Sequence, residues 1–250
     1  EYIHLLSDIY CRIDKRDDDF VLNPSKRDKN DHYRLLSALM ENPAPSWDPS
    51  AQTAMPTWKF PWLKSLVGTT EFALCRLPDG HLDIMKSYGK AKGATINDLI
   101  LTALFRAMFE ISKPPYGTPM DIPLTIDLRK FLPDKKAEAI RNLSSGVVMR
   151  LDRKPHETFE ETLSRVVAIT TKVKKGRPSI RGLKWGEFIE TMNFHQVCAF
   201  FEAESKFINM ISQSPINVFD KCCPILSNFG FISKSLINFG ENVVSDAYII

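Results

Sequence analysis

The most regular pattern in the chain is an alternation of apolar and polar positions near its middle. Every second residue from Met120 to Leu128 is apolar, and the positions between them hold Asp, Pro, Thr and Asp. Because successive side chains of a strand point to opposite faces, this stretch predicts a strand with one buried face. The same rule places Asp127 and Arg129 together on the other face, at the strand end. A second strand is predicted over Gly146–Leu151.

Helical periodicity accounts for much of the remaining chain. The clearest helix begins at Thr95, whose hydroxyl can cap the first turn while Asp98 returns the bond, and it is apolar on most sides. A long helix is predicted over residues 157–175, with acidic residues at its start, basic residues at its end and Gly176 after it. Further helices are expected at 2–10, 32–40, 81–92 and 183–210, and further strands at 69–77, 224–229 and 243–250.

Helices and strands therefore alternate without an internal repeat, which predicts a mixed α/β fold. The 250 residues are 44% hydrophobic and 25% charged, which suits one large domain or two small ones and excludes a disordered chain. The net charge of +3 gives no argument for nucleic-acid binding, and no apolar run is long enough for a membrane span. The five cysteines have no metal-type spacing, so we expect reduced, mostly buried thiols in a cytoplasmic protein without a bound metal.

The two ends of the sequence lead us to expect a piece of a longer protein. The first helix is already running at Tyr2 without a capping residue, and the chain stops on the apolar stretch Val243–Ile250. We therefore expect further polypeptide on both sides.

Few residues carry a known chemical motif. There is no phosphate-binding glycine loop, nucleophile elbow or paired-cysteine metal site, and His195 lies among apolar residues, which favours a structural role. Arg129 could hold a carboxylate from another part of the fold or form a local, solvated pair with Asp127. The sequence leaves both interpretations open.

Two further clusters have a functional and a structural interpretation. The basic stretch Lys172–Lys184 could contact phosphates or an acidic partner, but an exposed helix end is the favoured interpretation. Cys222 and Cys223 could form a redox pair, but neighbours on a strand point to opposite faces, so packing is favoured.

Several short segments together resemble one enzyme superfamily. GATINDLILTAL at 93–104 is followed by PLTIDLR at 123–129, by Asn142 with Gly146, by ETFEE at 157–161 and by SNFG at 227–230. In this order they resemble the motifs of the condensation-domain and CoA-dependent acyltransferase superfamily. Its members include peptide-synthetase condensation domains, polyketide-associated acyltransferases, wax ester synthases and alcohol acetyltransferases.

The resemblance implies a chloramphenicol acetyltransferase-like fold, in which a mixed sheet is flanked by helices. Such proteins have two subdomains with a tunnel between them. Residues 1–62 are then the end of the N-terminal subdomain with a crossover linker, and residues 63–250 are a truncated C-terminal subdomain.

The resemblance also implies a reaction. An acyl group moves from a CoA or carrier-protein phosphopantetheine thioester to an alcohol or amine, with no bound cofactor. The catalytic HHxxxDG motif is absent here and is expected upstream of Glu1, on the missing N-terminal half of the same protein. Arg129 pairs with that motif's Asp and shapes the site without carrying a proton, whereas Asn97, Ser227 and Asn228 line the tunnel. The alternative is a catalytically inactive condensation-like module that binds a carrier protein or another partner.

Overall fold

The computed structural model describes most of the middle of the chain and shorter stretches elsewhere. The described residues are 2–15, 30–44, 46–47, 71–137, 143–178, 188–189, 191–200, 202–203, 224–228 and 238–243. They belong to two compact units, each assembled from several stretches. Unit 1 comprises Glu1–Glu41, Asp127–Ser144 and Asn228–Ile250, and unit 2 comprises Asn42–Ile126 and Ser145–Ser227. The predicted boundary after residue 62 lies outside the described residues and stays a prediction.

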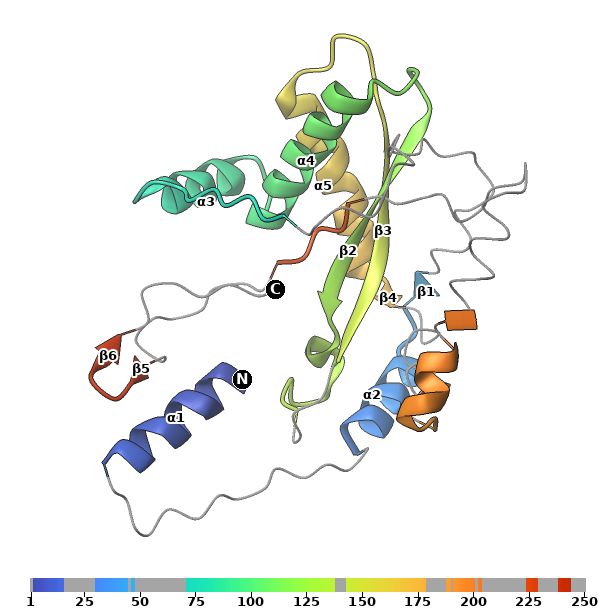
Figure 1. The fold of residues 1–250 in the computed structure, drawn as a ribbon. Helices are drawn as coiled ribbons and strands as arrows, with labels where there is room; N and C mark the ends of the chain where they lie inside the picture. Colours follow the sequence, from blue (N-terminus) through green and yellow to red (C-terminus); the bar gives the residue numbers. More distant parts are fainter. Residues whose placement is uncertain are drawn as a thin grey trace. The chain divides into compact units, whose positions relative to one another are not determined.

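Unit 2 contains a two-stranded sheet with two helices packed on one face. β2 (Pro119–Asp127) pairs with β3 (Ser144–Asp152), and α4 (Ile96–Ser112) and α5 (Phe159–Lys175) lie against the pair (Figure 1). At one end of the pair, the backbone N–H of residue 117 donates to the carbonyl of residue 153 at 3.0 Å. Farther along, residue 121 meets residue 150 across the pair, so the strands run antiparallel. The mixed α/β class is thus confirmed.

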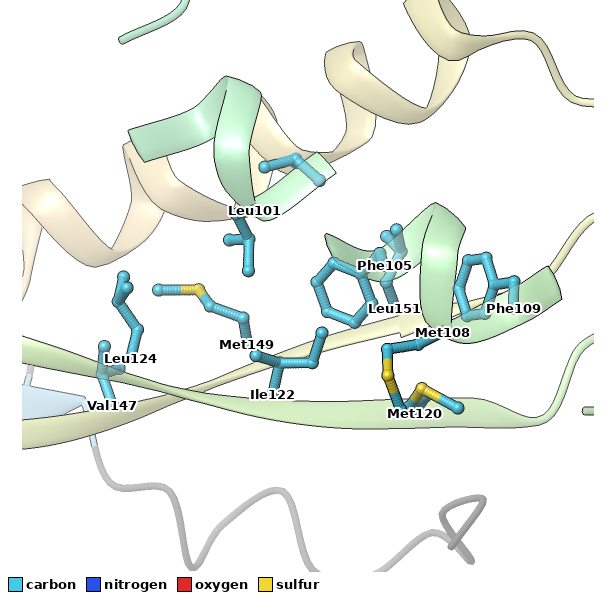
Figure 2. Packing of buried hydrophobic residues seen from close by; sticks show 11 residues of the cluster. Leu101, Phe105, Met108, Phe109, Met120, Ile122, Leu124, Val147, Met149 and Leu151 are labelled. Carbon is cyan, nitrogen blue, oxygen red and sulfur yellow. The ribbon is translucent and has the colours of Figure 1, made fainter. Parts of the chain in front are cut away.

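The predicted alternation decides which face of the sheet is buried. The core cluster takes its members from both helices and from alternating positions of both strands, each at most 9% exposed: Leu101, Phe105, Met108, Phe109, Met120, Ile122, Leu124, Val147, Met149, Leu151 and Val166. Figure 2 shows the side chains of α4 pointing onto those of β2 and β3. Burying a large apolar side chain contributes about 1.5–3 kcal/mol, so this cluster is the main stabilising feature of the unit.

Local signals set the ends of the helices in unit 2. The Asp98 N–H donates to Thr95 Oγ1 at 3.4 Å, and the Thr95 N–H donates to the Asp98 carboxylate at 2.7 Å, which is the predicted capping box. A second box, Thr158 with Glu161, starts α5 two residues later than predicted. α3 (His81–Ala91) also agrees with its prediction.

A distant segment pairs with the free edge of β2. The Leu226 N–H donates to Pro123 O at 2.9 Å, and the Thr125 N–H donates to Leu226 O at 3.1 Å, which makes a parallel bridge. The strand predicted over 224–229 is therefore reduced to this single bridge within the described residues 224–228. Elsewhere in the unit, β1 (Ser46–Trp47) pairs in parallel with β4 (Arg177–Pro178).

In unit 1, the first helix contacts a short hairpin near the other end of the sequence. β5 (Asn238–Phe239) and β6 (Asn242–Val243) pair antiparallel. Ser7 of α1 (Tyr2–Asp14) donates to Asn238 O at 2.6 Å and accepts the N–H of the same residue at 3.0 Å. The hairpin was not expected, and of the strand predicted over 243–250 only its first residue is described, in β6.

A second contact in unit 1 joins α2 (Asn30–Glu41) to the 3-10 turn Leu128–Phe131. The Arg34 guanidinium lies 3.2 Å from the fully buried carboxylate of Asp31 and 3.0 Å from Asp134. Arg34 thus ties the helix to the chain that follows the turn.

Two predictions about other segments are wrong. Residues 71–77 form no strand and every one of them is exposed, because no strand in the described part of the chain pairs with them. Cys11, Cys75 and Cys198 are free thiols as expected, but two of them are exposed and none is buried. Cys222 and Cys223 lie outside the described residues.

Candidate functional site

The Asp127–Arg129 motif sits in a tight turn at the end of β2. Asp127 Oδ1 accepts the Arg129 N–H at 3.0 Å and lies 3.1 Å from Arg129 Nη1. Leu128 between them is fully buried, and its N–H donates to Leu143 O at 2.8 Å, which anchors the turn. The local pair that the sequence left open is therefore present. The pairing of Arg129 with a carboxylate from other polypeptide stays a prediction.

The reason the two residues meet differs from the predicted one. The strand ends at Asp127, and Leu128 already belongs to the 3-10 turn, so Asp127 and Arg129 do not share a strand face. Instead, the Asp127 side chain caps the turn and bonds to the backbone two residues on, as aspartate commonly does. The arginine side chain is 27% exposed and the aspartate 61%, so the pair is partly accessible to solvent.

Ser227 lies beside β2 because of the parallel bridge at Leu226. Its hydroxyl oxygen is 3.0 Å from Thr125 Oγ1, and both residues are exposed. Thr125 was not among the predicted site residues, although it is a polar position of the alternating stretch and could have been identified from that pattern. The two hydroxyls can both donate and accept, so together they can bind a carbonyl or hydroxyl group.

The two predicted asparagines are accessible to a ligand. Asn97 is exposed in the first turn of α4, in unit 2, and Asn228 is exposed next to Ser227 in the chain but belongs to unit 1. Their proposed place in a tunnel stays a prediction.

Next to Asn97 in the sequence, Asp98 is a buried carboxylate, 1% exposed. Burial pushes the pKa of Asp98 upward, but hydrogen bonds from the Thr95 side chain and backbone, with help from Thr170 and Lys174, outweigh it. The pKa of Asp98 therefore lies below its ordinary value, and the group is charged at neutral pH. Asp98 Oδ2 accepts from both the N–H and the hydroxyl of Thr95, so Asp98 fixes the start of α4.

The other candidate groups have structural surroundings. Lys174 of the basic stretch lies 3.4 Å from Asp98, and Arg177 donates to Ala44 O at 3.1 Å. This agrees with the favoured interpretation of a helix end, while residues 179–187 lie outside the described part. His195 is on a helix as expected but is exposed, with its ring edge-on to Phe194 at 5.9 Å.

Two classes of site have no support in the described part of the chain. Among those residues, no three His, Cys, Asp or Glu side chains gather as a metal site would require. None of the helices described there has both the length and the hydrophobicity needed to cross a membrane.

Comparison with known proteins adds little to this description. No protein-family model matches the sequence, and no curated protein matches it. Among solved structures, the chain is similar to polyketide synthase associated protein 5 from Mycobacterium tuberculosis, with 14% sequence identity and a TM-score of 0.49. The similarity covers 68% of this chain and 44% of that chain, so the sequence spans less than half of that protein's length. The mixed α/β class rests on the structure itself.

Proposed function

We propose that this chain is part of an acyltransferase of the condensation-domain and CoA-dependent acyltransferase superfamily, with a chloramphenicol acetyltransferase-like architecture. It transfers an acyl group from a CoA or carrier-protein thioester to an alcohol or amine. A histidine on polypeptide outside the printed sequence removes the proton as the acceptor oxygen or nitrogen attacks. A C–O or C–N bond forms, the C–S bond breaks, and the thiolate leaves and takes up the proton.

The observation that carries the proposal is the pairing of two motif segments. PLTIDLR at 123–129 and SNFG at 227–230 are far apart in the sequence, yet Leu226, just before the second motif, bridges to β2 within the first. The pairing brings Ser227 to Thr125 through their hydroxyls.

Each predicted residue has a defined part in the proposal. Arg129 is a positioning residue: its planar fork holds the carboxylate of the histidine motif, while Asp127 keeps the turn in shape. Asn97, Ser227 and Asn228 contact the acyl or acceptor portion of the substrates. The thioester is a co-substrate and is not a resident cofactor.

The test uses the whole gene product from which this sequence comes. Free thiol release is followed with a chromogenic thiol reagent, for a panel of acyl-CoA and acyl-carrier donors with alcohols and amines. Arg129→Lys keeps the charge but removes the fork, so we expect kcat to fall about tenfold or more with KM nearly unchanged. Arg12→Lys is the matched control, because this exposed arginine also pairs with a nearby aspartate in unit 1 and its replacement should leave kcat unchanged.

Two results would contradict the proposal in different ways. If turnover is the same in the Arg129 variant as in the Arg12 variant, Arg129 has no positioning role. The gene product could instead lack the histidine motif, bind carrier protein and release no thiol from any donor. That result would contradict the enzyme and support the inactive binding module.

A further inference from the structure

A second polar feature lies at the end of unit 2 where α4 finishes and α5 begins. These helix ends lie together at one end of the sheet (Figure 1). At the end of α4 is a hollow of about 180 Å³, lined by residues from the last turns of α4, from the turn before β2 and from the loop after β3. That volume has room for several water molecules, and therefore for a small anionic group.

Arginines in this hollow are held in place by defined contacts. Arg106 Nη1 donates to Glu157 O at 2.9 Å and to Thr162 Oγ1 at 3.1 Å. The Arg153 guanidinium stacks over the Tyr116 ring, with 4.8 Å between the guanidinium carbon and the ring centroid. Both cations are thus preorganised, which lowers the entropy lost when they bind a ligand.

The balance of charge in the hollow is positive. Lys154 and His156 also line it, and the acidic lining residues are Glu110 and Glu157. The Glu157 side chain is 8% exposed, and its oxygens lie 2.9 and 3.1 Å from Arg165 Nη1. Arg165 also pairs with Asp152, so it offsets the charge of Glu157 only in part.

Three permanent cations, Arg106, Arg153 and Lys154, therefore line the hollow together with two carboxylates, and Arg165 partly offsets one of these. A cationic ligand would be repelled, whereas an anion with several acceptor oxygens could bind to more than one side chain at once.

We infer that this hollow binds a phosphate group, as inorganic phosphate or as a phosphomonoester. The planar fork of Arg153 matches the geometry of phosphate oxygens, and Lys154 adds a point charge at the exposed rim. Arg106, Phe109 and Tyr116 also line the hollow, and the aromatic rings can contact the group that carries the phosphate. This inference does not depend on the proposed transfer reaction.

The experiment measures the apparent Kd for inorganic phosphate, and for adenosine 5′-monophosphate, from the rise in Tm at constant ionic strength with chloride as the reference. We expect saturable stabilisation by both probes. Arg153→Gln should weaken binding about tenfold, because one charge-assisted pair is lost. Glu110→Gln should strengthen binding, since it removes one opposing charge. Lys86→Gln on α3 is the control: it removes an equivalent exposed charge in the same unit and should change nothing.

The probes also distinguish the source of the phosphate. If the nucleotide binds more tightly than inorganic phosphate, the site also recognises the group that carries the phosphate, and its ligand is a phosphomonoester. If the two affinities are equal, the site recognises the phosphate group alone. Stabilisation that does not saturate, or that is the same for Arg153→Gln and Lys86→Gln, overturns the inference. Arg153→Lys, which preserves charge and stem but not the fork, keeps the test valid should the glutamine variant fold poorly.

Discussion

The buried carboxylate of Asp98 gives the sharpest test of how unit 2 is stabilised. Replacing Asp98 with Asn preserves its shape but removes the charge that accepts from the Thr95 N–H and hydroxyl, each at 2.7 Å. Hydrogen bonds to charged groups contribute about 1.5–3 kcal/mol, against about 1 kcal/mol for neutral ones. We therefore expect the free energy of unfolding to fall by about 2 kcal/mol at pH 7.

The pH dependence of this loss follows from the direction of the shift. The pKa of Asp98 in the folded protein is lower than its ordinary value of 3.8. The stabilisation is therefore complete above that value and is lost as the pH falls through the folded pKa. The difference between the parent protein and Asp98→Asn should be constant from pH 7 to pH 5 and should shrink below pH 4.

Urea unfolding followed by circular dichroism at several pH values measures the effect. Asp83→Asn is the control, because that exposed carboxylate pairs with Lys86 on the surface and should contribute less than about 1 kcal/mol. Thr95→Ala should cost about 1 kcal/mol by itself and less than that in the Asp98→Asn background, since both changes break one capping box. A difference that persists undiminished at pH 3 would refute the reasoning.

Three other substitutions test features of unit 2. In an open helix, Gly→Ala raises the free energy of unfolding by about 1 kcal/mol. Gly89→Ala should instead lower the Tm, because the new Cβ would lie 2.9 Å from Ala94 O, and a raised Tm would contradict this. Lys113→Gly should stabilise by about 1 kcal/mol in urea unfolding, because this residue ends α4 in the left-handed region with φ 43°, and Lys113→Ala should show no such gain. Phe105→Ala should cost about 3–5 kcal/mol in the same assay, whereas Ile111→Ala, on a 68% exposed residue, should cost little.

Features encoded by neighbouring residues could be predicted from the sequence. The alternation through β2 identified its buried face, and the Thr95–Asp98 pair identified the start of α4, because both signals lie within a few residues. At α5 the start was misplaced by two residues. Glu157 looked like part of the helix, but its carboxylate pairs with Arg165 while Thr158 forms the cap.

Features that depend on distant pairing could not be predicted in detail. Nothing in the local sequence indicates that Leu226 joins β2, or that the hairpin at Asn238 binds Ser7. The candidate site shows the same division. Asp127 and Arg129 were identified from the motif, yet the turn that joins them depends on a hydrogen bond to the backbone. Thr125 is a polar position of the alternating stretch, but its proximity to Ser227 depends on the bridge at Leu226, which the local sequence does not indicate.

The bridge between Leu226 and β2 has a consequence for folding during synthesis on the ribosome. The two hydroxyl-bearing neighbours of that bridge are 102 positions apart, so the outer edge of β2 stays open while more than a hundred further residues are translated. An open edge offers unpaired amides to any other extended chain, and the nascent protein is therefore most vulnerable to aggregation in this interval. Truncation before residue 224 should leave the protein permanently in that state.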